Sequence, residues 1–254
     1  MVDIFNITIP ELTKDEERTA YVYVPDGDLD KRYPVLYMFD GQNLFYDETA
    51  TYGKSWGLLK YLEENKTPLI VASIACNSHE ENHEYGGRIS EYSPFSFEEE
   101  TLGKIKGRGK ITMDYLTQEF KKYIDDNYPT LKDRDNTYIA GSSMGGLMTL
   151  YALLEYNNYF SRGAALSPTL HLSTDNIKEM IKNSNVKKDT IIYMDYGEKE
   201  LFDYEDEDNW KDIIYLLQEK RILLDSRIVP GGKHFEASWE KQIPFFMNTL
   251  FYKV

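Results

Sequence analysis

Residues 136–156 read NTYIAGSSMGGLMTLYALLEY, and three patterns follow one another in this stretch. NTYIA is a short run typical of a strand, and an apolar segment with a helical period extends from about Gly145 to Tyr156. Between them, Gly141 to Gly145 has the G-x-S-x-G spacing around Ser143, and small residues suit a sharp strand-to-helix turn. An ordinary glycine and serine turn or helix cap is the alternative. The order of strand, motif and helix predicts that Ser143 is a nucleophile at the N-terminus of a helix.

Strand and helix patterns alternate on both sides of this stretch. Two N-terminal runs, 2–10 and 18–25, alternate polar and apolar residues and predict adjacent antiparallel strands. Further strands are expected at 34–39, 67–76, 162–168, 189–197 and 223–231, and helices at 55–66, 111–128, 174–183, 208–220 and within 236–250. Such alternation predicts a single α/β domain over 1–254, with a mainly parallel sheet, antiparallel N-terminal strands and helices on both faces. The segment 77–110 lacks a clear period and is expected to form a long loop insertion over the active-site face.

A serine hydroxyl needs a base, usually a histidine that a carboxylate orients. His234 fits this role because it lies in GGKHFEASW, after the last predicted strand and before the last helix; a surface histidine capping that helix is the alternative. The acid should follow the preceding strand. Asp195 lies inside that strand, Glu198 and Glu200 lie in the turn after it, and the carboxylates from Asp203 onward resemble the charged start of a solvated helix.

These residues occur in an order that resembles the esterase D group of the α/β-hydrolase superfamily, over most of the chain. The markers are VLYMFDGQNLF (35–45), SWGLLKYL (55–62), RISEYSPF (88–95), GSSMGG (141–146), ALSP (165–168), YMDYGEKE (193–200) and GGKHFEASW (231–239). The resemblance implies an α/β-hydrolase fold and a serine esterase that needs no metal or organic cofactor. The group includes feruloyl and acetylxylan esterases, S-formylglutathione hydrolases, enterochelin esterases and mycolyltransferases.

The resemblance also implies roles for individual residues. The acid of this group typically stands three residues after the glycine that ends its strand, which selects Glu200; many relatives have Asp there, so Glu198 and Asp203 stay open. The oxyanion hole of the group implies the backbone N–H groups of Met144 and Gln42. Two converging backbone donors are what a tetrahedral oxyanion requires. An ordinary turn at residues 40–43 is the alternative reading.

The stretch SHEENHEYGG (78–87) contains H-E-x-x-H, the pattern of zinc proteases. It lacks apolar residues at helical spacing and a third ligand downstream, so a zinc hydrolase is not expected. Since the stretch follows a buried strand, His79 and His83 are candidates for the pocket wall, together with Arg88 and Tyr92. Arg88 could instead form an ion pair with Glu84 or Glu91. Further candidates for substrate contact are Trp56 and Ser142.

Composition limits the partners and the location. The net charge is −14, with 43 acidic and 29 basic side chains, so nucleic acid and anionic membrane surfaces are not expected as partners. Cys76 is the only cysteine, which excludes an internal disulfide and a cysteine-rich zinc site. The N-terminus lacks the pattern of a secretory signal, and no apolar run reaches the roughly 20 residues of a membrane span. A cytoplasmic location is therefore expected.

Together these patterns predict a serine carboxylic-ester hydrolase. Ser143, His234 and Glu200 would form the triad and act through an acyl-enzyme, on a small-molecule or carbohydrate-linked ester of the acetyl or feruloyl type. An acyltransferase with the same triad and a catalytically idle binding protein on the same fold are the alternatives. The sequence does not select the natural ester or an oligomeric state.

Overall fold

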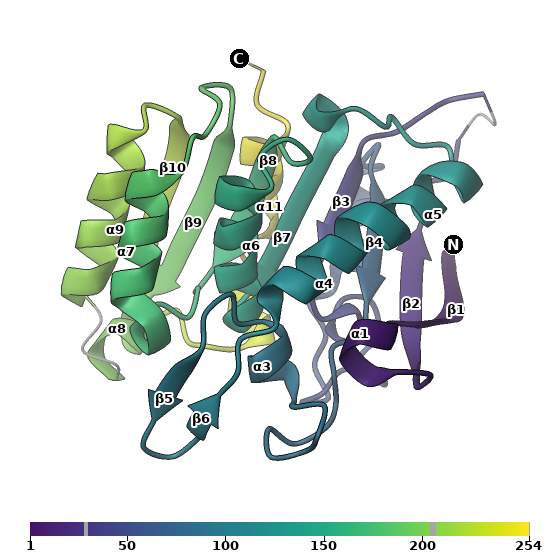
Figure 1. Ribbon diagram of the computed structural model, residues 1–254. Coiled ribbons are helices and arrows are strands. Elements are labelled where there is room, and N and C mark those ends of the chain that lie inside the picture. Colours follow the sequence, from purple (N-terminus) through teal and green to yellow (C-terminus); the bar gives the residue numbers. More distant parts are fainter. Residues whose placement is uncertain (28–29, 204–206, 254) are drawn as a thin grey trace.

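The structure is a computed structural model that describes residues 1–27, 30–203 and 207–253, without the side chains of residues 201–203. Within these residues, eight strands form one sheet in the order β1-β2-β4-β3-β7-β8-β9-β10 (Figure 1). The strands are β1 (Val2–Thr8), β2 (Glu17–Tyr23), β3 (Val35–Met38), β4 (Ile70–Ile74), β7 (Thr137–Ser142), β8 (Arg162–Leu166), β9 (Ile191–Gly197) and β10 (Leu223–Val229).

The predicted mainly parallel sheet with antiparallel N-terminal strands is confirmed. From β4 to β10 every neighbouring pair is parallel, whereas β2 runs antiparallel to both β1 and β4. All residues of β3, β7 and β9 are buried, as expected for parallel strands that helices cover on both faces. The apolar runs in the sequence therefore correspond to the centre of the sheet.

Helices cover both faces of this sheet. One face of the sheet lies in front in Figure 1. Most of the helices that cover it are α4 (Gly109–Tyr115), α5 (Lys121–Asn127), α6 (Met144–Glu155), α7 (Thr174–Asn183) and α9 (Glu207–Glu219). The other face packs against α2 (Leu58–Glu64), α10 (Glu236–Glu240) and α11 (Ile243–Leu250). Three short helices, α1 (Pro10–Thr13), α3 (Arg88–Glu91) and α8 (Glu198–Asp203), complete the α-helices of the described residues, and 3₁₀ turns lie at Gly41–Asn43, Arg134–Asn136 and His171–Ser173. Two apolar cores, one on each side of the sheet, result from this arrangement.

Helix α6 lies at the centre of one core. Every residue from Met144 to Leu150 is buried, and the helix is apolar around most of its circumference. A helix of this kind is enclosed by other elements and does not lie on the surface. The residue that precedes it, Ser143, is therefore attached to one of the most enclosed helices of the molecule.

Three segments differ from the prediction. Residues 77–110 contain helix α3 and an antiparallel hairpin of β5 (Phe97–Glu99) and β6 (Gly103–Ile105), so this insertion is not a plain loop. Figure 1 shows the hairpin beyond the carboxyl ends of the central strands. The helix expected at 111–128 contains a π-helical segment at 116–120 between α4 and α5, and the last helix is split into α10 and α11, with proline in the first turn of α11. Hydrophobic period alone does not report such interruptions.

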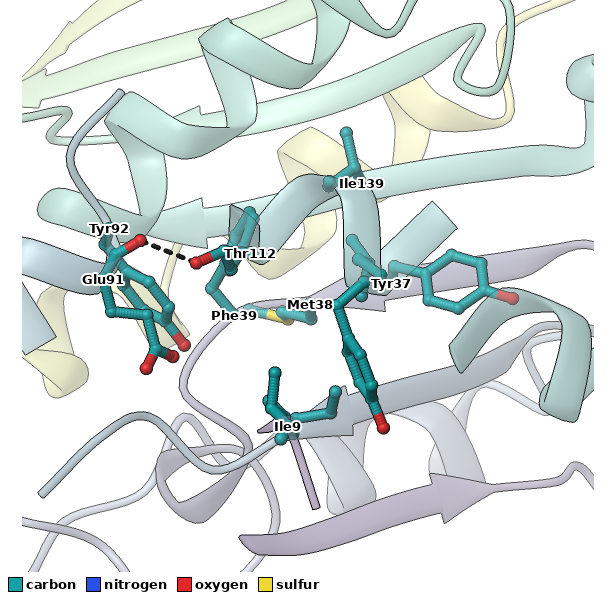
Figure 2. A pocket seen from close by; sticks show the side chains of 11 residues that line it. Ile9, Tyr37, Met38, Phe39, Glu91, Tyr92, Thr112 and Ile139 are labelled. Atoms are coloured by element: carbon teal, nitrogen blue, oxygen red, sulfur yellow. Dashed lines mark hydrogen bonds between the residues drawn. The ribbon is translucent and has the colours of Figure 1, made fainter. Parts of the chain in front are cut away.

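A small internal cavity lies between the sheet and α4 (Figure 2). Its volume is about 30 Å³, and mainly apolar side chains line it, including Ile9, Phe39 and Ile139. At one end, the Thr112 hydroxyl donates to the Glu91 carbonyl oxygen at 2.8 Å. This space would hold roughly one water molecule, so this core is close to fully packed. Among the described residues, no helix has both the length and the apolar character of a membrane span.

Candidate active site

Ser143 forms the corner between β7 and α6. Its φ of 59° and ψ of −125° lie in a region that non-glycine residues rarely occupy. A Cβ on Gly141 would lie 2.7 Å from backbone atoms of Gly145, so glycine is required beside the corner. The Ser143 N–H donates to the Leu166 carbonyl oxygen at 3.0 Å, which ties the corner to strand β8. Local sequence and neighbouring strand together hold the serine in this strained conformation.

The first turn of α6 presents backbone donors beside Ser143. The Leu147 N–H donates to the Ser143 carbonyl oxygen at 3.0 Å. The N–H groups that precede it, beginning with Met144, have no acceptor within the helix, because the first turn of any α-helix lacks one. The helix dipole adds partial positive charge at the same end. An oxygen with developing negative charge would be stabilised here.

A second turn of backbone follows β3. Asp40 has a φ of 61°, and a 3₁₀ turn, η1 (Gly41–Asn43), comes directly after it. The Gln42 side chain is anchored at the end of β4, because its Oε1 accepts from the Cys76 N–H at 3.1 Å and its Nε2 contacts Cys76 Sγ at 3.2 Å. A Cβ on Gly41 would lie 2.9 Å from Ser73 Oγ, so the turn packs tightly on β4. The turn that carries Gln42 is therefore held in place by contacts with the end of β4.

Arg88 forms a partly buried ion pair with Asp40. Its Nε and Nη2 donate to the two carboxylate oxygens of Asp40 at 2.6 and 2.7 Å, and the Asp40 side chain is 5% exposed. The alternative pairing of Arg88 with Glu84 or Glu91 is wrong, because Glu91 pairs with Arg18 at 2.6 Å. Such a two-pronged contact fixes the orientation of both groups. Arg88 therefore stabilises the turn that carries Gln42, and it also lines an open cavity.

Glu200 and His234 lie in hydrogen-bonding contact. His234 Nδ1 is 2.6 Å from Glu200 Oε2, and Glu200 is 2% exposed. The other carboxylate oxygen of Glu200 accepts from the Gly197 N–H at 3.0 Å and from the Ser167 hydroxyl at 2.8 Å. A Cβ on Gly197 would lie 2.6 Å from backbone atoms of Gly232, so glycine is needed where the chain leaves β9.

The other two candidate acids differ in their surroundings. Glu198 Oε2 accepts from the Gly231 N–H at 2.8 Å. The side chain of Asp203 lies outside the described residues. Glu198 and Glu200 both lie in the first turn of α8, yet it is Glu200 whose carboxylate forms the hydrogen bond with His234 Nδ1. Tertiary structure thus separates two carboxylates that are only two positions apart.

Two further buried carboxyl groups lie close to these residues. Burial raises the pKa of Asp195 to about 7, with a contribution from the nearby Glu200 charge. Burial also raises the pKa of Glu236, which follows His234 by two positions and is 3% exposed. Among the described residues, Glu236 Oε2 is a buried oxygen without a hydrogen-bond partner. Burial favours the neutral, protonated form of a carboxyl group.

A wide open cavity brings these elements together. Its volume is about 1250 Å³, and Ser143, His234, Gln42 and Arg88 all line it. The wall also includes Tyr21, Asn43, Tyr52, Ala75, Cys76, Asn77, His79, Thr101, Leu102, Phe235, Glu236 and Trp239. The cavity is polar on the side of residues 77–82 and aromatic beside His234. It lies at the carboxyl ends of the parallel strands, where ligands bind in open α/β sheets.

The HEENH stretch forms turns and not the helix that a zinc protease requires. His79 Nε2 is 2.7 Å from Glu16 Oε2, and the rings of His79 and His83 stack with centroids 3.9 Å apart. His79 lines the cavity, whereas His83 is exposed and is not among the lining residues. The stretch therefore places one histidine on the cavity rim.

Three of the residues proposed for substrate contact lie in the interior instead. Trp56 is 2% exposed and stacks on Trp239, with ring centroids 5.7 Å apart. Tyr92 is 3% exposed and borders the internal cavity of Figure 2. Ser142 is the last residue of β7 and is 5% exposed. None of the three is among the residues that line the open cavity, so contact of these residues with a substrate stays a prediction.

Sequence reasoning missed several residues around the site. In the sequence Asp40 belongs to a turn and nothing more, although its carboxylate holds Arg88. Ser167 is visible only within ALSP, although its hydroxyl contacts Glu200. Trp239, in the marker GGKHFEASW, donates from Nε1 to Ser167 Oγ at 2.9 Å. The motifs themselves were the available signal, but a motif does not show which side chain contacts which.

A mainly parallel sheet covered on both faces, with a strained serine corner after a central strand, defines the α/β-hydrolase class of fold. The family model described as "Putative esterase" matches residues 12–250. The chain belongs to this esterase family.

Known proteins are similar to this chain at low sequence identity. "Uncharacterized protein YbbA" of Bacillus subtilis (strain 168) is 23% identical over 172 residues, which cover 66% of this chain and 62% of YbbA. The chain thus spans less than two thirds of that relative. An IroE-like serine hydrolase from Shewanella oneidensis has a TM-score of 0.73 at 18% identity, covering 98% of this chain and 79% of that one. Siderophore hydrolase EstA from Aspergillus nidulans has a TM-score of 0.72 at 16% identity, covering 98% and 95%.

Proposed function

We propose that the chain is a serine carboxylic-ester hydrolase. Ser143 Oγ attacks the ester carbonyl carbon while its proton passes to His234, and the same proton then protonates the leaving alcohol as the C–O bond breaks. Water, activated by His234, releases the acyl group from Ser143 in the second half of the reaction. Membership of the esterase family and the strained serine corner support the proposal.

The contact between Glu200 and His234 is the observation that carries this proposal. The bond of 2.6 Å uses His234 Nδ1, so proton exchange with Ser143 falls to Nε2. A buried carboxylate in this position fixes the tautomer and stabilises the imidazolium that forms during the reaction. Glu200 is 2% exposed, and two further donors hold its second oxygen. The carboxylate is therefore positioned before any substrate binds.

The backbone N–H groups of Met144 and Gln42 would form the oxyanion hole. Met144 begins α6, and Gln42 lies in the 3₁₀ turn η1. The first hydrogen bond of this turn runs from the Asn43 N–H to the Asp40 carbonyl oxygen. Preorganised donors of this kind each lower the barrier by roughly 3 kcal/mol. The ion pair of Arg88 and Asp40 would hold the Gln42 donor in place.

The open cavity supports hydrolysis of esters with a bulky alcohol or acyl part. A volume of about 1250 Å³ admits water to Ser143, which favours hydrolysis over transfer to another acceptor. Tyr52 and Phe235, 80% and 42% exposed, could contact an acetylated sugar or a feruloyl-type ring. One structurally similar protein is named a siderophore hydrolase, so siderophore esters belong in the same substrate panel.

Replacing Ser143 with Ala tests the proposal. Hydrolysis of p-nitrophenyl acetate should fall at least 1000-fold, and a fluorophosphonate should add its mass to the wild-type protein at Ser143 but not to Ser143→Ala. Ser161→Ala is the matched control, since Ser161 is a buried serine that directly precedes the first residue of β8. Wild-type rates in Ser143→Ala would refute the proposal. Failure of the wild-type protein to react with the fluorophosphonate would favour an idle binding protein, and acyl products with added alcohols or sugars would favour an acyltransferase.

A further inference from the structure

The ALSP motif places a strained serine beneath the proposed triad. Ser167 follows β8 directly, is 1% exposed and has a φ of 41°. Left-handed backbone is uncommon for serine and persists only where the surrounding structure enforces it. Its N–H donates to the Asp195 carbonyl oxygen at 3.0 Å and to Asp195 Oδ1 at 3.2 Å. The backbone of Ser167 is therefore held firmly by the neighbouring strand β9.

The hydroxyl of Ser167 has two partners, and their chemistry determines its orientation. Trp239 Nε1 lies 2.9 Å from Ser167 Oγ, and an indole N–H can only donate. Ser167 Oγ must therefore accept from Trp239 and donate its single proton to Glu200 Oε1, at 2.8 Å. No rotation of the hydroxyl satisfies both partners in any other way. The bond to Glu200 is thus a charge-assisted hydrogen bond whose direction is set by Trp239.

This bond decides which oxygen of Glu200 contacts His234. Oε1 already accepts from two donors, the Ser167 hydroxyl and the Gly197 N–H. Oε2 is the oxygen left for His234 Nδ1. Glutamate has one more rotatable bond than aspartate, so a triad acid of this length loses more conformational freedom when it is fixed. The Ser167 hydroxyl restrains the Glu200 side chain, and Ser167 is itself held in one conformation by β9.

We infer that Ser167 is a positioning residue for the proposed triad acid Glu200, acting with Trp239 as its orienting donor. The inference rests on the proposed function. Ser167 is separated from substrate by Glu200 and His234, so it acts on the reaction only through Glu200. The Asp195 carboxyl group accepts a hydrogen bond from the Ser167 N–H, and this contact keeps Ser167 in its strained conformation.

A second buried carboxyl explains why a neutral donor suits this position. Burial raises the pKa of Asp195 to about 7, and the charge of the nearby Glu200 contributes to this rise. A cation between the two carboxyl groups would pair with both and weaken the contact of Glu200 with His234. A serine hydroxyl stabilises the Glu200 charge without neutralising it. The arrangement keeps the negative charge of Glu200 available to His234.

A double-mutant cycle with Ser167→Gly and Glu200→Gln tests the inference. Glycine removes the hydroxyl and accepts the positive φ, so the variant should fold. We expect kcat/KM for p-nitrophenyl acetate to fall about 10- to 100-fold in Ser167→Gly, mostly in kcat, with a matching loss in the rate of fluorophosphonate labelling. In the Glu200→Gln background, the same change should cost less than about threefold, because Ser167 then has no triad carboxylate to hold.

The outcomes separate the inference from the proposed function. Ser161→Gly, the same substitution just before β8, should leave kcat/KM within about twofold of the wild-type value. Equal losses from Ser167→Gly in both backgrounds would show a merely structural role and overturn the inference while leaving the esterase proposal intact. An unchanged rate in Ser167→Gly, or in Glu200→Gln, would overturn it as well. Retained hydrolysis in Ser143→Ala would instead refute the proposed function itself.

Discussion

Asp195 allows a quantitative test of the charge buried beneath the site. Its carboxyl group is 1% exposed, and burial raises its pKa from 3.8 to about 7. The unfolded chain exposes the group to water, where the ordinary pKa returns, so the folded protein binds this proton more tightly. The contribution of this proton to the free energy of unfolding is fully present below the pKa that Asp195 has in the unfolded chain. It is lost as the pH rises through the pKa of about 7 that Asp195 has in the folded protein.

The size of the effect follows from the shift. A rise of about 3 pKa units corresponds to about 4 kcal/mol in total, of which roughly 2 to 3 kcal/mol is lost between pH 5 and pH 8. Asp195→Asn has no proton to lose in this range. Its amide can keep both contacts of the carboxyl group, accepting from the Ser167 N–H and donating to the Tyr193 hydroxyl. The stability of Asp195→Asn relative to wild type should therefore rise by roughly 2 to 3 kcal/mol from pH 5 to pH 8.

Urea unfolding followed by tryptophan fluorescence at several pH values measures this difference. Comparing the variant with the wild type at each pH cancels the other titrating groups, which are common to both proteins. Asp208→Asn is the control, because the Asp208 side chain is 98% exposed and its replacement should shift stability by less than about 0.5 kcal/mol at every pH. A difference between Asp195→Asn and wild type that stays flat with pH would refute the reasoning.

Two further predictions concern the walls of the cavity. Glu236→Gln should raise the free energy of unfolding by about 1 kcal/mol at pH 8 and by less at pH 5. The reason is that burial raises the pKa of Glu236 and that one of its carboxylate oxygens is buried without a hydrogen-bond partner. A lower urea midpoint for Glu236→Gln than for the wild type at pH 8 would contradict this. Arg88→Lys should lower kcat/KM about tenfold, because lysine cannot hold both oxygens of Asp40 and the turn that carries Gln42 loosens; unchanged steady-state kinetics would contradict this.

Much of the fold could be predicted because its signals are local. Continuous apolar runs predicted the buried strands, helical spacing predicted most helices, and G-x-S-x-G predicted the corner at Ser143. The π segment at 116–120 and the division between α10 and α11 were missed, because a period of apolar residues looks the same across a local break. The hairpin within 77–110 was missed because its strands are only three residues long each.

The candidate site divides in the same way. The sequence by itself determined the α/β class and the family, and it predicted the order of the candidate serine, acid and histidine, because each depends on neighbouring residues or on a short motif. Tertiary structure decided that Glu200 and not Glu198 meets His234, that Arg88 pairs with Asp40, and that Trp56 lies in the core. Arg88 and Asp40 are 48 positions apart, and His234 and Glu200 are 34 apart. Contacts over such separations depend on how strands and loops meet in space, which no local pattern encodes.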